Sequence, residues 1–390
     1  MRILLVSPFD FQARGGVNQH ILHLDKQFRH MGHETRILGA ATLDYGEMDD
    51  GHIRTIGTAL PIPSNGSQAR ITLSPLVINK VRNFLDEEPF DVIHAHEPLA
   101  PLLPLATWLY SKSLNVGTFH AARDSNIWYL YTKAVLDMFV DRLDVRIAVS
   151  EAAREFADNH FPGDYDIIPN GIDLEQYHPD VRPIQELADG HKNILFVGRY
   201  SESRKGFIHL LRAFPLVRSQ FPEARLIVVG AGNRVRFERM IADEGIDNVV
   251  FVGAVDDRLK MRYYASCDVF CAPSTGRESF GIILLEALAI GKPVVASNIP
   301  GYAGVIEHGV TGMLTKPKDS NDLALALVRM LADTDLRQQV VDNGLRHVQQ
   351  FSWENVARQI IRAYEHGLAL GPRERRPTGR LTEVLVSADG

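Results

Sequence analysis

The sequence predicts an α/β protein with two Rossmann-like domains that face each other across a cleft. Short runs of β-branched and leucine residues alternate with amphipathic stretches, a pattern typical of parallel sheets whose strands are connected by helices. This pattern occurs twice, and a segment rich in Pro, Gly and Asp separates the two series. The chain has 390 residues, which is too long for one compact core and suits two domains of ordinary size.

The first series predicts a domain over residues 1–175. The runs expected to form its strands are RILLVS, ETRILG, FDVIHAH, NVGTFH and VRIAVS. The stretch VNQHILHLDKQFRHMG has helical periodicity, and Gly32 closes the predicted helix. Ligands of open α/β sheets bind at the carboxyl ends of the strands, so the residues that directly follow these runs are the candidates for chemistry.

The second series predicts a domain over residues 191–350, which a linker over 176–190 precedes. Its expected strands are the runs NILFVG, RLIVVG, VVFVGA, DVFCAP and PVVAS. The stretch FSWENVARQIIRAYEHGL predicts a final amphipathic helix over 351–370. Residues 371–390 are mostly polar and are expected to form a flexible tail.

The composition is that of a soluble globular protein, with 45% hydrophobic residues, 23% charged residues and a net charge of −6. This charge gives no support to a general nucleic-acid binder. The apolar run before Ser7 is too short for the core of a signal peptide, and no apolar run approaches the roughly 20 residues that span a bilayer. Cys267 and Cys271 are too few for a disulfide framework and are expected to be buried thiols. The chain is therefore expected to be cytoplasmic and to meet a membrane only at its surface.

Two glycines, Gly15 and Gly16, lie between the first predicted strand and the first predicted helix. Paired glycines let backbone N–H groups approach a ligand closely, and a helix N-terminus favours an anion. No third glycine follows at the spacing of the dinucleotide motif GxGxxG, so a nicotinamide dehydrogenase is disfavoured. This pair can therefore be interpreted either as part of a phosphate-binding site or as a flexible turn.

Two cations, Arg199 and Lys205, follow the first strand of the second domain in the motif FVGRYSESRKG. A guanidinium fork and a lysine point charge can converge on one diphosphate. Alone they could be ordinary surface cations. Opposite a glycine pair across a cleft, they predict a diphosphate site.

Two acids, Glu278 and Glu286, lie eight positions apart in the motif GRESFGIILLE, where a helix is expected to begin near Phe280. A carboxylate there can accept two hydrogen bonds from vicinal hydroxyls of a ribose or a hexose. The backbone N–H groups of Phe280, Gly281 and Ile282 at the same helix N-terminus suit a phosphate. The alternative for Glu286 is a solvated helix residue.

Three histidines lie at strand ends in the first domain. His120 ends the run NVGTFH and is expected to face the cleft, although a lone histidine is often structural. His94 and His96 alternate along the end of FDVIHAH and could resemble a pair of metal ligands. Because no third ligand is apparent, the sequence favours packing, capping or substrate contact, and no metal site is expected.

The glycine pair, GRYSESRKG and ESFGIILLE together resemble the retaining glycosyltransferases of glycosyltransferase family 4, which have the GT-B fold. The resemblance covers nearly the whole chain, including the last helix, which in that family crosses back onto the first domain. The segments ALPIPSNGSQARITLSP, IIPNGID and HEPLAPLLP further resemble a branch of the family, the mycobacterial phosphatidylinositol mannosyltransferases that use GDP-mannose.

The resemblance implies a role for each donor-side candidate. The backbone at Gly15 and Gly16 of the first domain would contact the donor diphosphate. Arg199 and Lys205 of the second domain would bind its phosphates. Glu278 would contact the sugar being transferred, and Glu286 the ribose hydroxyls; the helix N-terminus at 280–282 completes the donor site.

On the acceptor side, the resemblance implies that His120 lies beside the reacting sugar. Asn65, Ser67 and Arg70 match the loop that would bind a lipid phosphate or an inositol head group. After His120 the branch usually has a Thr/Ser-rich turn that ends in lysine, whereas this chain reads AARDSN and places Arg123 in roughly the lysine's position.

The helix that faces the membrane in these mannosyltransferases corresponds to SPLVINKVRNFLDEE, which carries only Lys80 and Arg82, followed by three acids. Attraction to anionic lipid is worth about 1 kcal/mol per cation, so fewer cations weaken the link to a membrane. The acceptor therefore stays open between phosphatidylinositol, another lipid such as diacylglycerol, and a soluble polyol phosphate or sugar.

The function expected from the resemblance is transfer of a hexose, with retention, from a nucleotide sugar such as GDP-mannose to a lipid head group at the inner face of the plasma membrane. A UDP-sugar is the alternative donor, and a sugar-nucleotide-binding protein without turnover is the alternative from another class. Bond cleavage builds negative charge on the diphosphate, and the two cations can stabilise it without a metal. The sequence has no convincing Asp-x-Asp at a strand end, so no cofactor and no metal are expected.

Overall fold

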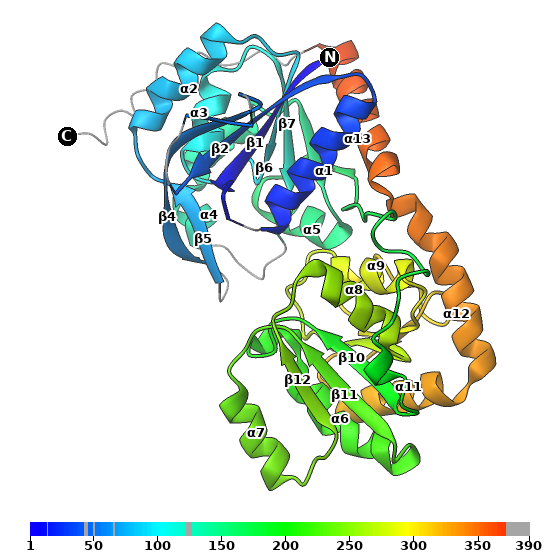
Figure 1. The fold of residues 1–390 in the computed structure, drawn as a ribbon. Helices are drawn as coiled ribbons and strands as arrows, with labels where there is room; N and C mark the ends of the chain where they lie inside the picture. Colours follow the sequence, from blue (N-terminus) through cyan, green and yellow to red (C-terminus); the bar gives the residue numbers. More distant parts are fainter. Residues whose placement is uncertain (14, 43–45, 50, 65–66, 122–126, 372–390) are drawn as a thin grey trace. The chain divides into compact units, whose positions relative to one another are not determined.

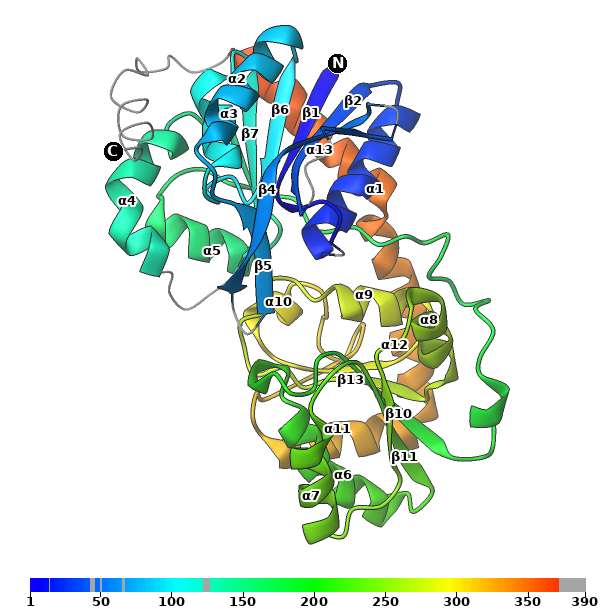
Figure 2. The same cartoon turned by 60° about the vertical axis from the view of Figure 1, so that its left-hand side comes forward.

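The structure is a computed structural model that describes residues 1–13, 15–42, 46–49, 51–64, 67–121 and 127–371. Its chain divides into two compact units. The first unit combines Met1–Asn170 with the segment that starts at Trp353, and the second unit is Gly171–Ser352. Each unit is a sheet with helices on both faces (Figures 1 and 2), which confirms the expected α/β fold with two Rossmann-like domains.

The described part of the first unit contains one sheet of nine strands. Its parallel ladder runs from β4 through β2, β1, β6, β7 and β8 to β9. The strands are β1 (Arg2–Asp10), β2 (Glu34–Ala41), β3 (Glu47–Met48), β4 (Ile53–Ser64), β5 (Ser67–Thr72), β6 (Val92–His96), β7 (Leu114–Phe119), β8 (Val145–Ala148) and β9 (Asp166–Ile167). The five runs expected to be strands each lie on one of them.

Two helical layers cover this sheet, and β1 shows why. Side chains of a strand alternate between the two faces, so Ile3 and Leu5 pack in the core under α1 and α13, while Leu4 and Val6 pack in the core under the other helices. The helices are α1 (Gly16–His30), α2 (Leu76–Glu87), α3 (Leu103–Tyr110), α4 (Ile127–Val140), α5 (Glu151–His160) and α13 (Trp353–Leu370). Both views show α1 and α13 on the same face (Figure 2).

The segment expected to be an acceptor-side loop forms instead a long antiparallel hairpin of β4 and β5. Pro61 and Pro63 both lie in β4, opposite Arg70 and Gln68. Proline lacks an N–H group and is tolerated in strands where that group is not needed for the ladder. The prediction failed because composition alone does not show whether such a segment pairs with another strand.

The second unit has six parallel strands in the order β12-β11-β10-β13-β14-β15. Counted within the unit this is the Rossmann order 3-2-1-4-5-6, in which ligands bind where the order reverses, here between β10 and β13. The strands are β10 (Lys192–Val197), β11 (Ala224–Val229), β12 (Val249–Gly253), β13 (Val269–Ala272), β14 (Val294–Ser297) and β15 (Met313–Thr315). The sequence predicted the first five and missed β15, which is only three residues long.

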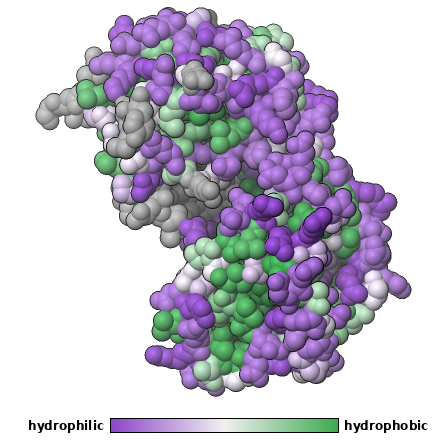
Figure 3. Space-filling model, viewed as in Figure 1, coloured by the Kyte–Doolittle hydropathy of each residue, from purple (hydrophilic) through white to green (hydrophobic). Residues whose placement is uncertain are grey.

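Helices complete the second unit and cover its sheet. They are α6 (Phe207–Gln220), α7 (Arg234–Asp243), α8 (Asp257–Ser266), α9 (Ile282–Ala289), α10 (Pro300–Ala303), α11 (Ser320–Ala332) and α12 (Thr334–His347), with 3-10 turns η1 (Gln185–Leu187), η2 (Ser203–Lys205) and η3 (Val348–Phe351). Figure 3 shows apolar side chains exposed mainly on this unit in that view. Val250, on the edge strand β12, is an exposed apolar residue of this unit.

Residues 176–190, expected to be a linker, pack on the second unit. The backbone N–H of Ile184 donates to Oγ of Ser266 over 2.8 Å, and Tyr177 is buried. Their Pro, Gly and Asp content reflects the near absence of regular structure in the segment but carries no information on what it packs against. Within the described residues no helix is long and apolar enough to cross a bilayer.

Candidate active site

The loops after β10 and β13 are in direct contact at the point where the strand order of the second unit reverses. Gly206 has a φ of 68°, and a Cβ on it would lie 1.8 Å from the carbonyl oxygen of Pro273, so only glycine fits this approach. The backbone N–H of Thr275 donates to the carbonyl oxygen of Arg204 over 2.7 Å. Neighbouring strands thus bring the two predicted loops together, as the Rossmann order requires.

Two cations converge on one carboxylate oxygen in these loops. Lys205 Nζ lies 2.7 Å from Oε1 of Glu278, and Arg204 Nη1 lies 2.6 Å from the same atom. Oγ of Ser274 donates to it over 3.3 Å. The Glu278 side chain is only 13% exposed, so the ion pairs are partly shielded from water.

Arg199 joins this cluster through a second acid. Its Nε lies 2.7 Å from Oε1 of Glu202, and Nη2 of Arg204 lies 2.8 Å from Oε2 of Glu202. The structure therefore places Lys205 against Glu278 and connects Arg199 to this pair through Glu202 and Arg204. Three cations and two acids leave a net charge of +1, which suits an anionic ligand.

The sequence prediction missed Arg204 and Glu202. Both lie in the motif GRYSESRKG, and Arg204 directly precedes Lys205. Loop residues follow no periodic pattern, so the sequence does not show where their side chains point. Only the short spacing of Arg204 and Glu202 from Arg199 and Lys205 could have suggested a shared site.

The N-terminus of α9 follows Glu278 directly. Phe280 is buried, with its ring 5.9 Å from that of Phe351, and Ile282 begins the helix two residues later than expected. Gly281 has a φ of 100° and a Cβ there would come within 2.7 Å of the Tyr302 ring, so the turn requires glycine. The N-cap residue of α9, Gly281, makes no side-chain cap, and the backbone N–H of Leu284 donates to the Gly281 carbonyl oxygen over 2.9 Å.

Glu286 is buried inside α9, so the solvated alternative is wrong. Its Oε1 accepts from Lys260 Nζ over 2.8 Å and from the Tyr177 hydroxyl over 3.1 Å, and its Oε2 accepts from the Tyr264 hydroxyl over 2.9 Å. Burial disfavours the ammonium of Lys260, but Glu286 and Tyr177 together outweigh this effect and raise the pKa of Lys260. Glu286 thus belongs to a network of its own, separate from that of Glu278.

In the first unit, Gly15 and Gly16 lie at the N-terminus of α1. No side chain of the described residues caps this terminus, and a Cβ on either glycine would meet no atom within 4 Å. The turn before it is fixed by Asn18, which accepts from the Ser7 hydroxyl over 2.7 Å and donates to the Asp10 carbonyl over 2.8 Å. Packing therefore does not require the two glycines, and the space beside them is open.

His120 follows β7, and its Nε2 lies 2.9 Å from Nδ1 of His96. Its backbone N–H donates to Oε1 of Glu97 over 3.0 Å, and Glu97 has a φ of 53°, unusual for a residue with a side chain. Burial lowers the pKa of His120 to about 3, so the ring is neutral at physiological pH.

His94, in contrast to His120, has both ring nitrogens paired with side chains of the core. They lie 2.6 Å from the Tyr364 hydroxyl and 2.6 Å from Oγ1 of Thr118.

Of the predicted acceptor residues, the structure describes the side chains of Arg70 and His120. Nη1 of Arg70 donates to Oγ1 of Thr42 over 2.9 Å and lies 3.6 Å from Oδ2 of Asp10. Ser67 begins β5. Asn65 and Arg123 lie outside the described residues.

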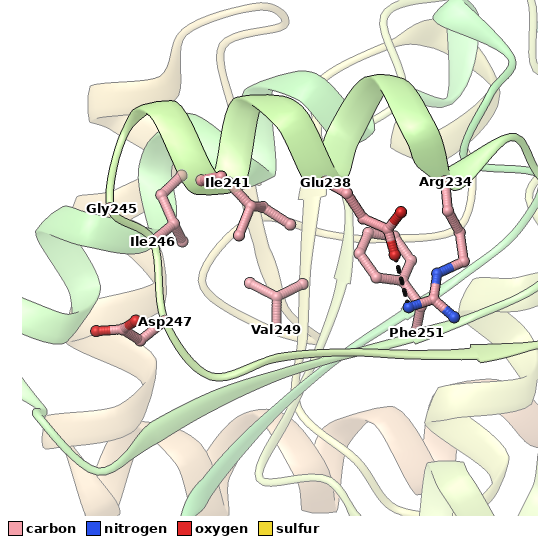
Figure 4. Close-up of a pocket in the computed structure, with 9 residues that line it drawn as sticks. Arg234, Glu238, Ile241, Gly245, Ile246, Asp247, Val249 and Phe251 are labelled. Carbon is pink, nitrogen blue, oxygen red and sulfur yellow. Dashed lines mark ion pairs between the residues drawn. The ribbon is translucent and has the colours of Figure 1, made fainter.

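A pocket of about 360 Å³ lies between α7 and β12 in the second unit (Figure 4). Its polar rim includes the ion pair between Arg234 and Glu238, whose atoms are 2.8 Å apart, and the Arg234 guanidinium lies over the Phe251 ring. No predicted site residue lines it. The candidate active site is therefore defined by the charged clusters and not by this pocket.

Comparison with known proteins agrees with this geometry. Residues 14–176 match the family model described as Glycosyltransferase Family 4, and residues 178–347 match the one described as Glycosyl transferases group 1. A phosphatidyl-myo-inositol mannosyltransferase from Mycobacterium leprae is 38% identical over 367 residues, which cover 94% of this chain and 96% of the relative.

Solved structures share the fold at lower identity. A glycosyltransferase from Rickettsia africae superposes with a TM-score of 0.75 at 20% identity, covering 94% of this chain and 98% of the other. Anabaena HepE in complex with UDP and glucose superposes with a TM-score of 0.73 at 23% identity, covering 94% of this chain and 100% of the other. These two similarities concern the fold alone.

Proposed function

Because the chain belongs to glycosyltransferase family 4, among the phosphatidyl-myo-inositol mannosyltransferases, we propose that it is a mannosyltransferase. In the proposed reaction, it transfers a mannosyl group from GDP-mannose to the head group of phosphatidylinositol. The observation that carries the proposal is the cluster of Arg199, Lys205 and Glu278 at the strand-order reversal of the second unit. It combines groups for a diphosphate with a carboxylate for sugar hydroxyls.

The second unit would bind the donor. When the bond between the anomeric carbon and the phosphate oxygen breaks, its electron pair goes to the diphosphate. Lys205 and Arg199 would stabilise that charge, and they are held in place by acids before any substrate arrives, so little reorganisation is needed during the reaction. Two such cations can take the role that a divalent ion has in other transferases, so the proposed reaction needs no metal.

Glu278 would have two tasks in this scheme. As a carboxylate it can accept hydrogen bonds from the mannose hydroxyls, and it already orients Lys205 through a 2.7 Å contact. Glu286 would accept hydrogen bonds from the ribose hydroxyls. Lys260 and two tyrosines hold its carboxylate in a fixed orientation for this role.

The first unit would supply the N-terminus of α1, at Gly15 and Gly16, for the diphosphate and His120 for the reacting sugar. A neutral imidazole can accept a hydrogen bond from a sugar or acceptor hydroxyl, but with a pKa of about 3 it is a poor proton donor at neutral pH. In the retaining reaction that we propose, the acceptor oxygen forms the new bond to the anomeric carbon. Its proton passes to the departing phosphate oxygen, so no separate base is required.

The acceptor and the membrane contact are the finer parts of the proposal. Arg70 is exposed near Thr42 and could meet an acceptor phosphate. Leu73, shortly before α2, and Leu76, its first residue, are exposed by 44% and 70%, and Lys80 follows on this helix. Exposed leucines beside few cations suit a peripheral contact with the inner membrane surface that depends more on apolar insertion than on charge.

Labelled nucleotide sugars test the proposal. A thermal-shift screen identifies the donor, with GDP-mannose expected to stabilise the protein more than UDP-sugars. Labelled donor is then incubated with phosphatidylinositol vesicles, with diacylglycerol vesicles or with soluble inositol phosphate. Label in lipid extracted from the phosphatidylinositol vesicles is the expected result. Label confined to aqueous products, or hydrolysis without transfer, would contradict the lipid acceptor.

A further inference from the structure

Three histidines from different elements of the first unit surround one point. His20 comes from α1, His96 ends β6 and His120 follows β7. Their ring centroids are separated by 4.9 to 5.2 Å, and one nitrogen of each ring lies within 4.8 Å of one nitrogen of the others. His20 is a third histidine beside His96 and His120, which the sequence did not reveal.

Two nitrogens of this cluster lack a partner among the described residues. Nδ1 of His20 lies 2.9 Å from Oδ1 of Asn170, and this pairing leaves the buried Nε2 of His20 without a hydrogen bond. Nδ1 of His96 pairs with His120, and the buried Nε2 of His96 is also without one. Buried polar atoms are nearly always satisfied, so two such atoms in one cluster indicate a missing partner.

The chemistry of the cluster suits a transition metal. Burial lowers the pKa of His20 and of His96, so both rings are neutral, and neutral imidazole is the form that binds metal. From Zn–N bonds of about 2.0–2.1 Å, tetrahedral ligand nitrogens should lie about 3.3 Å apart. Nδ1 of His96 now pairs with Nε2 of His120 over 2.9 Å, so the His96 side chain must rotate to bring its unpaired Nε2 to an ion shared with the other two rings.

We propose that His20, His96 and His120 bind one transition-metal ion of the class that prefers imidazole, with Zn²⁺ as its representative. The fourth position would be open to water, as in sites with three protein ligands. Asn170 orients His20 through its other nitrogen, the kind of outer contact that fixes a ligand's tautomer. His120 is not fully buried, which gives an ion a way in.

A bound ion would occupy the imidazole of His120 and should therefore inhibit transfer. Metal binding itself does not depend on the proposed function, whereas the inhibition rests on it. The ion would lie in the first unit and would not replace Arg199 or Lys205 at the diphosphate.

Binding is tested on the full chain after treatment with a chelator. Titration calorimetry with ZnCl₂ should show a single ion per chain, and Co²⁺ should give the ligand-field absorption of a tetrahedral nitrogen site. His20→Asn and His96→Asn should each weaken Zn²⁺ binding by roughly tenfold or more. His30→Asn is the matched control, because His30 is exposed in the last turn of the same helix, and it should bind as the wild type does.

Several results would overturn the site: no saturable Zn²⁺ binding by wild type, affinity unaffected by either folded variant, or equal loss in His30→Asn. The wild-type Co²⁺ spectrum tests the proposed geometry even if a variant does not fold, because octahedral absorption would exclude a tetrahedral site. In the transfer assay, Zn²⁺ should inhibit wild type and a chelator should restore it. Binding without inhibition would refute the inhibitory role, and a metal-free enzyme without transfer would refute the proposed function instead.

Discussion

Lys205 Nζ lies 2.7 Å from Oε1 of Glu278, although the two residues are on different loops of the second unit. The close approach depends on Gly206, whose missing side chain allows the loops to touch. In the proposed reaction, the pair would hold a cation for the diphosphate next to an acid for the sugar hydroxyls. A bound donor would place its sugar–phosphate bond beside this pair, so that each side chain exchanges part of its present contact for a contact to substrate.

Glu202 should act as a positioning residue for Arg199 and Arg204. Its carboxylate holds both guanidinium groups, so Glu202→Gln should lower kcat/KM for the donor by roughly tenfold, or about 1.4 kcal/mol. Most of the loss should appear in KM if the arginines bind the diphosphate equally in the ground and transition states.

Glu202→Asp keeps the charge and should recover part of the loss. Glu238→Gln is the control, because Glu238 forms an exposed ion pair with Arg234 on the same unit. Equal kinetics for Glu202→Gln and wild type would show that the arginines do not need this anchor.

The two acids of the GRESFGIILLE motif should be separable by ligand. Glu286→Gln should weaken GDP and GDP-mannose alike, by roughly tenfold, because the ribose is common to both. Glu278→Gln should weaken GDP-mannose but leave GDP at least as tight as in wild type, because it frees Lys205 and Arg204 for the diphosphate. Titration calorimetry measures all four affinities, and the reverse pattern would exchange the proposed roles.

Gly16→Ala should separate stability from activity. A Cβ there meets no atom within 4 Å, so the free energy of unfolding should stay equal or rise by up to about 1 kcal/mol, as for glycine to alanine in a helix. Transfer should nevertheless fall by roughly tenfold if the diphosphate approaches this backbone.

Gly281→Ala is the contrasting variant, with its φ of 100° and a Cβ 2.7 Å from Tyr302, and it should lower thermal stability. Thermal unfolding and initial rates measure both properties. Unchanged activity in Gly16→Ala would indicate that the glycine pair is only a turn.

Acid should destabilise the first unit through its buried histidines. His94 and His120 have pKa values of about 3 in the folded protein, against about 6.5 in the unfolded chain, chiefly because burial disfavours the charged ring. Between these values the unfolded state binds more protons, so stability is lost as the pH falls below about 6.5, by up to about 1.4 kcal/mol per histidine and pH unit.

Thermal unfolding between about pH 7 and pH 5 measures this effect. His120→Asn should flatten the pH dependence, whereas His30→Asn, at an exposed position of α1, should leave it unchanged. If wild type and His120→Asn lose stability equally as the pH falls, then burial does not lower the pKa of His120 in the folded protein.

Much of this architecture could be predicted because it follows from local patterns. Apolar runs that end at glycine or at polar residues located the strands, and the rule that ligands bind at strand ends pointed to Arg199, Lys205 and Glu278. The same rule found His120 and the glycine pair. These residues share one property, a fixed position just after a parallel strand.

The residues that were missed depend on tertiary placement. His20 lies on the buried side of α1, and its helical spacing from the apolar residues of α1 is that of an ordinary core residue. It approaches His96 only because the folded unit brings α1 next to the end of β6. Tyr177 and Lys260 reach Glu286 from separate segments that no local pattern connects. The β4–β5 hairpin was missed because the composition of a segment does not show whether it pairs with another strand.

Mass spectrometry of the lipid product tests the central claim most directly. Phosphatidylinositol vesicles with GDP-mannose and wild-type protein should yield a lipid heavier by one hexose, with an α-linkage if the anomeric configuration is retained. Glu278→Gln and Lys205→Ala should each lower the rate of its formation by at least roughly tenfold while they remain folded. Absence of any hexosylated lipid, or formation of it at wild-type rates by both variants, would contradict the account.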